Sequence, residues 1–251
     1  MLSQVLTQIR TSMEDRGFPR DMVESLPVLV NDLENLKVQN IAGWLREVKS
    51  RLDEKEQYLD VWAQGWFAWA FAFNGFAMTM NPSGSIGPDL LVKVRSQDIF
   101  VEVRRFRTDY EERKRLEEGG PDGELVPYGD FSKDVRRVLD AVQAKSRQGK
   151  GIPDGSSYMV AIRSDKDSIE ELEFQDAVSE LEAEAQAGGG RYPAIGAVFF
   201  HNGWKNLPAQ TLWYVWRNPH AAPGRCPSAE ITEKFKALSL PPTHIRHNTQ
   251  G

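Results

Sequence analysis

Residues 87–107 of the sequence, GPDLLVKVRSQDIFVEVRRFR, decide the fold that we expect for this 251-residue chain. Two apolar runs, Leu90 to Val94 and Ile99 to Val103, are each about one strand long. The polar break between them, residues 95–98, is typical of a β-hairpin, although it lacks the Asn-Gly or Asp-Gly of the strongest hairpin turns. The stretch therefore predicts two antiparallel strands joined by a tight turn.

The register of this hairpin determines which charged side chains meet. A turn at residues 96–97 places Asp89 opposite Arg104, and Glu102 lies two residues before Arg104 on the same strand. Opposite residues share a face of a sheet, as do residues i and i+2 of one strand. We therefore expect Asp89, Glu102 and Arg104 to converge on one face, with a bidentate ion pair between Arg104 and Asp89.

Two carboxylates among apolar residues repel each other and lose solvation, and a shared cation relieves both effects. Oxygen ligands of this kind suit Mg²⁺ or Mn²⁺ rather than zinc. Such a metal activates water and neutralises charge on a phosphate. The alternative is a purely structural arrangement, in which Asp89 begins a strand beside a surface pair of Glu102 and Arg104.

The residues Pro88-Asp89, followed after a gap by Glu102-Val103-Arg104, resemble the motif of the PD-(D/E)XK nuclease superfamily. The resemblance covers roughly Lys55 to Arg217. It implies a restriction-endonuclease-like α/β fold, a mixed sheet flanked by helices. It also implies a hydrolase that cleaves phosphodiester bonds with the help of Mg²⁺ or Mn²⁺. The enzyme would be an endonuclease whose first expected substrate is DNA, with RNA as the second. Asp89 and Glu102 would hold the metal, and Arg104 would position water or stabilise negative charge.

Arg104 stands where the family has lysine. Lysine can lose its proton, whereas arginine cannot at any relevant pH. If the chemistry needs that group as a base, the chain is inactive; if it needs only positive charge, the chain retains activity. The alternative function is therefore a catalytically inactive nuclease-fold module that binds nucleic acid or a protein partner.

A helix from Glu54 to Asn74, ended by Gly75, precedes the hairpin. Glu56 and Asp60 are neighbours on it at spacing i, i+4, and the resemblance implies that this helix supplies a further metal-binding acid. The alternative is a solvated first half of the helix. The order of helix, glycine, short strand, small-residue loop, Pro-Asp and hairpin also resembles the core of the family.

Basic residues on the hairpin and on the following amphipathic helix, Tyr128 to Gln148, predict a phosphate-contacting surface. The alternative is an ordinary solvated helix face, and two acids, Asp134 and Asp140, dilute the charge. The candidate nucleic-acid-binding residues are Arg105, Arg107, Lys133, Arg136, Arg137 and Lys145.

We expect three segments: an α-helical N-terminal extension (1–53), the restriction-endonuclease-like core (54–217) and a Pro-rich C-terminal segment with one short helix (218–251). The net charge is −5, but residues 165–184 hold nine acids and one lysine, so the rest of the chain sums to +3 and is compatible with a basic face. The uncharged run 61–88 is interrupted by polar residues, glycine and proline, which predicts no membrane span. One cysteine and no signal peptide predict a cytoplasmic location. The partners that we consider are nucleic acid, which the resemblance implies, and a second copy of the chain in a homodimer.

Overall fold

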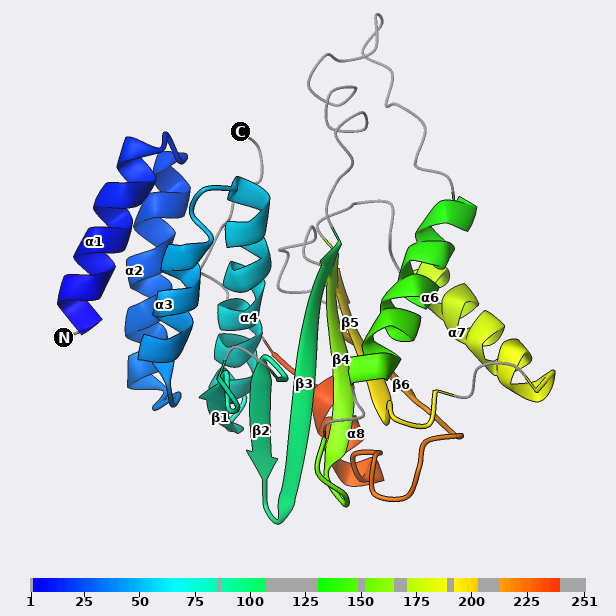
Figure 1. Cartoon of the computed structure of the whole chain (residues 1–251). Helices are drawn as coiled ribbons and strands as arrows, with labels where there is room; N and C mark the ends of the chain where they lie inside the picture. The colour runs from blue at the N-terminus through cyan, green and yellow to red at the C-terminus, as the bar shows by residue number, and fades with distance from the viewer. Residues whose placement is uncertain are drawn as a thin grey trace, which may run out of the picture.

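The computed structural model describes residues 2–84, 87–106, 131–148, 152–164, 171–188, 192–202 and 213–239. This part of the chain is an α/β fold in which a six-stranded mixed sheet, in the order β1-β2-β3-β4-β5-β6, is flanked by helices. Figure 1 shows helices α1 to α4 on one side of the sheet and helices α6 and α7 on the other. The predicted α/β class with a mixed sheet between helices is confirmed.

The N-terminal extension is helical, as predicted. It comprises α1 (Leu2–Asp15), α2 (Arg20–Asn35) and α3 (Ile41–Ser50). These helices share one buried hydrophobic cluster with the rest of the core. In addition, the amide of Gln39 donates to the carbonyl of Met78 at 2.9 Å, and the amide of Met80 donates to the carbonyl of Gln39 at 3.0 Å. The extension is thus bound to the sheet through its backbone as well as through its apolar side chains.

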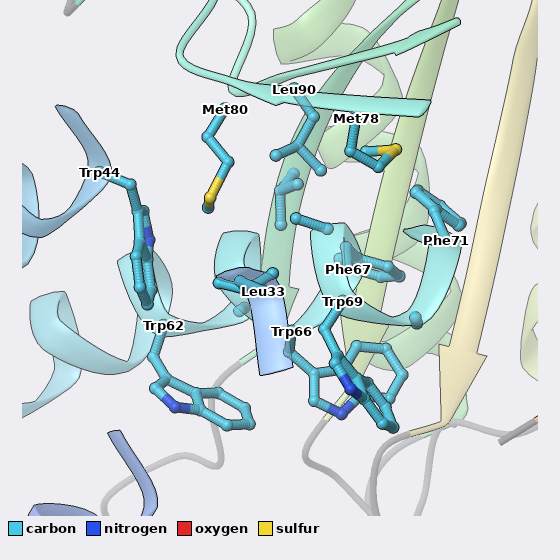
Figure 2. Close-up of a cluster of buried hydrophobic side chains, with 14 of the residues drawn as sticks. Leu33, Trp44, Trp62, Trp66, Phe67, Trp69, Phe71, Met78, Met80 and Leu90 are labelled. Carbon is cyan, nitrogen blue, oxygen red and sulfur yellow. The ribbon is translucent and has the colours of Figure 1, made fainter. Parts of the chain in front are cut away.

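Helix α4 (Lys55–Phe73) lies between the N-terminal helices and the sheet. Because it is covered on both sides, residues from Trp62 to Ala72 are almost uniformly buried and show no single apolar stripe. Figure 2 shows its aromatic side chains among residues from α2, α3 and the first strands. Trp44 of α3 fixes one contact, since its indole Nε1 donates to the carbonyl of Val61 at 2.9 Å. Phe73, whose helical spacing predicts a place on the buried face, is instead 42% exposed.

The first half of the sheet is antiparallel and contains β1 (Ala77–Met80), β2 (Leu90–Val94) and β3 (Gln97–Phe106). The second half adds β4 (Ser157–Ser164) and β5 (Ala197–Asn202), which run parallel to β3, and then β6 (Trp213–Arg217), which runs antiparallel to β5. Strand β3 extends beyond the start of β2, because the pairing between them begins at Leu90 and Val101. Residues 102–106 therefore lie beside β4 on one side only, among the described residues.

The hairpin between β2 and β3 exists, but its predicted register was wrong by two residues. Val94 pairs with Gln97, so the turn is Arg95-Ser96, and Arg95 takes a left-handed conformation with φ 54°. Continued by one residue beyond Leu90 and Val101, this register places Asp89 opposite Glu102 rather than opposite Arg104. A slip of two residues keeps every side chain on its predicted face, whereas a slip of one would have reversed them.

Helices α6 (Phe131–Gln148) and α7 (Glu171–Gln186) cover the opposite face of the sheet, over a second hydrophobic cluster. The short C-terminal helix α8 (Ala229–Lys236) was predicted, but as part of a separate segment. Its Phe235 is fully buried and stacks on Phe76 with ring centroids 4.9 Å apart, so α8 completes the first cluster. In the described residues no helix combines the length and the apolar character that a membrane span requires.

Candidate functional site

Asp89 lies immediately before β2, beside the part of β3 that β2 does not cover. Both carboxylate oxygens accept a hydrogen bond: Oδ1 from Gln64 Nε2 at 2.8 Å and Oδ2 from the backbone N–H of Val103 at 2.7 Å. The bond from the Val103 N–H joins the Asp89 side chain to β3 at the position where a longer β2 would pair with β3 through its backbone. The position of this carboxylate is therefore set by α4 on one side and by the β3 backbone on the other.

Glu102 is 7% exposed and points from β3 toward α6. Lys145 of α6 reaches it, and its Nζ lies 2.5 Å from Glu102 Oε1. The hydroxyl of Tyr158 on β4 donates to the carbonyl of Lys145 at 3.2 Å and so holds that turn of α6 against the sheet. This buried ion pair joins the hairpin to a helix that begins 29 residues after Glu102 in the sequence.

The charges of the two carboxyl groups interact, but their contacts do not lie on one face as expected: Asp89 contacts Gln64 of α4, and Glu102 contacts Lys145 of α6 on the opposite side of the sheet (Figure 1). Burial and the nearby charge of Glu102 raise the pKa of Asp89 from 3.8 to about 8, although the Val103 amide and Lys145 act in the opposite direction. Burial, followed by the same two acids, also raises the pKa of Tyr158. The raised pKa favours the protonated form of Asp89 near neutral pH.

Glu56 and Asp60 lie on the predicted helix, but both face Arg105 rather than Asp89. Arg105 Nη1 is 2.8 Å from Glu56 Oε2 and 3.6 Å from Asp60 Oδ1. The Arg105 side chain is only 4% exposed. The predicted role of Arg105 in contacting phosphate does not fit this geometry, because alternation along β3 turns it toward α4 and into the protein.

Arg104 points to the opposite face from Arg105 and is exposed. The expected ion pair between Arg104 and Asp89 is wrong, since the oxygens of Asp89 accept from Gln64 and Val103. The cation that contacts Glu102 is Lys145, which comes from α6 and not from β3. From the sequence, Lys145 was predicted only as part of a phosphate-contacting surface, not as a partner of Glu102.

The remaining predicted phosphate contacts are divided among several environments. Arg136 is exposed and pairs with Asp140 along α6 at 3.0 Å, and Arg137 is half-buried. Lys133 lies in the first turn of α6. Arg107 lies outside the described residues. Lys145, another member of this basic set, contacts Glu102.

The sequence analysis missed Gln64, Glu47 and Asn81. Gln64 is 8% exposed, and its second side-chain polar atom, Oε1, is buried without a hydrogen-bond partner among the described residues. Glu47 of α3 accepts a hydrogen bond from the side-chain Nδ2 of Asn81 at 2.8 Å. The backbone N–H of Asn81 donates to the backbone carbonyl of Asp89 at 2.7 Å. A signal for Gln64 was present: it follows Glu56 and Asp60 at spacing i+4 and is a polar residue inside an apolar helix.

In the part of the chain that the structure describes, no group of three or more histidine, cysteine, aspartate or glutamate side chains is arranged to hold a metal ion. Oxygen donors at the cluster comprise two carboxylates and the amide of Gln64. Comparison with family models, with curated proteins and with solved structures found no match for the chain.

Proposed function

We propose that the chain is a divalent-metal-dependent nuclease of the PD-(D/E)XK type, which hydrolyses phosphodiester bonds in nucleic acid, with DNA as the substrate. The observation that carries the proposal is the cluster at the start of β2, where Asp89 and Glu102 adjoin and Lys145 binds Glu102 at 2.5 Å. Two acids and an ammonium are the groups that the resemblance implies, with the ammonium supplied from another element.

The arrangement of the elements supports the proposed restriction-endonuclease-like fold. Helix α4 leads through Gly75 into β1, and a loop leads to Pro88-Asp89 and the β2–β3 hairpin. This is the order of elements on which the resemblance was drawn. The helix also packs beside the hairpin, as that order requires, since Gln64 of α4 contacts Asp89.

The residues present fit Mg²⁺ or Mn²⁺ in their chemistry. Carboxylate and amide oxygens are the ligands these ions prefer, and Gln64 has a buried polar atom that lacks a partner among the described residues. The raised pKa of Asp89 indicates a site where a cation would replace a proton. A bound divalent ion would polarise the phosphate and lower the pKa of a water molecule.

Each protein group has a separate task in this proposal. Gln64 and the Val103 amide orient Asp89, and Glu102 binds Lys145, so the ammonium is held beside the two acids. There it stabilises negative charge that develops on the phosphate. The exposed Arg104 lies on the same face as Glu102 and contacts the phosphate backbone of the substrate.

The inactive binding module is the second candidate, and one observation favours it. With Asp89 protonated and Glu102 paired to Lys145, the cluster is neutral without any metal. A site that satisfies itself in this way serves a structural role as readily as a catalytic one. Only the response to metal and to DNA separates the two functions.

The first experiment is a set of melting curves with and without Mn²⁺. A ligand that binds only the native state raises thermal stability by mass action. We expect a shift for the wild-type protein that disappears in the Asp89→Ala, Glu102→Ala double variant. Nicking of supercoiled plasmid with Mg²⁺ then tests hydrolysis. An equal shift in both proteins means that the metal binds elsewhere and removes the support for this site.

A further inference from the structure

Four polar or charged side chains form a row across the sheet, on the face that α4 covers. The register pairs Arg105 of β3 with Arg163 of β4, and Arg163 with His201 of β5. His201 is paired in turn with Trp213 of β6. Paired residues of neighbouring strands share a face of the sheet, and Arg105 contacts Glu56 of α4, so the whole row lies on the α4 side.

The row lies at the carboxyl ends of the parallel strands. Arg105, Arg163 and His201 are each the last residue but one of their strands, β3, β4 and β5. Open α/β sheets bind their ligands beyond the carboxyl ends of parallel strands, where side chains from several strands converge. The row therefore occupies a part of the sheet that is suited to a ligand, and the proposed function uses none of its four side chains.

The two arginines of the row have different surroundings. Arg105 contacts the carboxylates of α4 described above. Arg163 is buried and lies over the rings of Trp62 and Trp66, with its guanidinium carbon 5.1 and 4.5 Å from their centroids. These cation–π contacts hold the guanidinium in place beside His201.

His201 and Trp213 carry buried nitrogen atoms without hydrogen-bond partners. His201 is 1% exposed, and neither its Nδ1 nor its Nε2 has a partner among the described residues. The same holds for Nε1 of Trp213, which is 7% exposed. The His201 ring packs against Trp213 and Trp66, with centroids 4.3 and 4.5 Å away. A buried polar atom without a partner costs stability, so three such atoms in two neighbouring rings point to a ligand that supplies the partners.

The donors of the row match an oxyanion. Arg163 and the indole of Trp213 can only donate hydrogen bonds, and neither offers a lone pair to a metal ion. Burial, and next the charge of Arg163, lower the pKa of His201 well below 6.5, so its ring is neutral, with one N–H donor and one acceptor nitrogen. A carboxylate has no hydrogen to give to that acceptor nitrogen. Hydrogen phosphate has both the negative oxygens that the donors require and an O–H group for the acceptor.

We propose that Arg163, His201 and Trp213 bind a phosphate group at the carboxyl ends of β4 and β5. The guanidinium and the two ring N–H groups donate to its oxygens, and its hydroxyl donates to the second nitrogen of His201. Because these nitrogens are buried in this structure, the rings have to separate locally to admit the ion. Binding should therefore change the surroundings of the Trp213 indole.

The inference does not rest on the proposed function. The acidic cluster uses Asp89, Glu102 and Lys145, which come from the start of β2, from β3 and from α6, whereas the phosphate site uses β4, β5 and β6. The stabilisation of the protein by Mn²⁺ should be unchanged in Trp213→Phe. Loss of phosphate binding and loss of metal binding are therefore separate results.

The first test follows the indole N–H signals of the ¹⁵N-labelled protein by NMR. Inorganic phosphate is titrated in, and sodium chloride at equal ionic strength is the reference. The signal of Trp213 is identified by its loss in the Trp213→Phe variant. We expect this signal to shift with phosphate and to saturate with a dissociation constant below about 10 mM. A shift that does not saturate, or one that chloride produces equally, would overturn the proposal.

The second test uses variants that separate a ligand site from a structural cluster, with phosphate affinity measured by calorimetry. His201→Leu removes both ring nitrogens and should weaken phosphate binding by ~10-fold or more, while the melting temperature without phosphate rises by about 3 °C. Trp213→Phe keeps a ring, removes the N–H and should also weaken binding by ~10-fold. The control, Trp69→Phe, makes the same change on α4, where Trp69 stacks on Phe73, and should leave the affinity unchanged. Equal phosphate affinity in all four proteins would contradict the site.

The third test identifies the source of the phosphate by comparing inorganic phosphate, adenosine monophosphate and adenosine. Tighter binding of adenosine monophosphate than of inorganic phosphate supports a phosphomonoester as the ligand, and the reverse order supports the free ion. Binding of adenosine that equals the binding of its monophosphate would overturn the proposal, because the phosphate group would then contribute nothing.

Discussion

Replacement of Asp89 by asparagine should change how the stability of the protein depends on pH. Burial and Glu102 hold the pKa of Asp89 at about 8 in the folded protein, against 3.8 when it is free in solution. Between these values the native state keeps a proton that the unfolded state has lost. The sign follows directly: the free energy of unfolding falls as the pH rises through this window.

The magnitude follows from proton linkage. One proton corresponds to at most about 1.4 kcal/mol per pH unit, so between pH 5 and pH 7 the wild-type protein should lose on the order of 2 kcal/mol relative to Asp89→Asn. Asparagine keeps the size of the side chain and an oxygen acceptor, and it cannot ionise.

Urea unfolding of both proteins at several pH values between 5 and 7 measures this difference. Asp98→Asn, an exposed change on the same hairpin, is the matched control and should shift the curve by less than about 0.5 kcal/mol at every pH. Parallel curves for wild type and Asp89→Asn would mean that Asp89 is ionised in the native protein. The reasoning about the acidic pair would then be wrong.

Three further predictions concern contacts at and near the site. Lys145→Met leaves Glu102 buried without its cation and should cost about 3 kcal/mol in urea unfolding, whereas Lys145→Arg should retain most of the stability; equal losses would contradict the ion pair. Arg105→Ala should also cost about 3 kcal/mol, and Arg104→Ala less than about 0.5 kcal/mol, because only Arg105 is buried; the reverse order would refute the assigned faces. Gly65→Ala places a Cβ 2.4 Å from the Trp44 ring and should lower stability by about 2 kcal/mol; an unchanged melting temperature would show that this contact relaxes freely.

The fold could be predicted from the sequence wherever local patterns determined it. The residue patterns predicted the helical N-terminal extension and α4, and two short apolar runs predicted the hairpin. The register of the hairpin could not be fixed, because the polar break has no Asn-Gly or Asp-Gly to locate the turn. An error of two residues leaves the face of each strand residue unchanged, but Asp89 lies just before β2 and contacts Gln64 of α4, whereas Glu102 contacts Lys145 of α6.

The sequence indicated Asp89 and Glu102 as candidate site residues, but it did not indicate the contact between Glu102 and Lys145. Lys145 reaches Glu102 from a helix that is remote in sequence, and spacing alone carries no information about that contact. Arg105 was different. It follows Val101 and Val103 at a spacing of two, so strand alternation already indicated an inward side chain.

Cleavage of supercoiled plasmid by the purified protein tests the central claim, a metal-dependent hydrolytic site at Asp89, Glu102 and Lys145. We expect nicking with Mg²⁺ or Mn²⁺ that EDTA abolishes and that Glu102→Ala reduces by more than ~100-fold. Arg104→Lys should change the rate little, because Arg104 does not pair with Asp89. Equal rates for the wild type and Glu102→Ala, or no cleavage by either protein while both remain folded, would contradict the account.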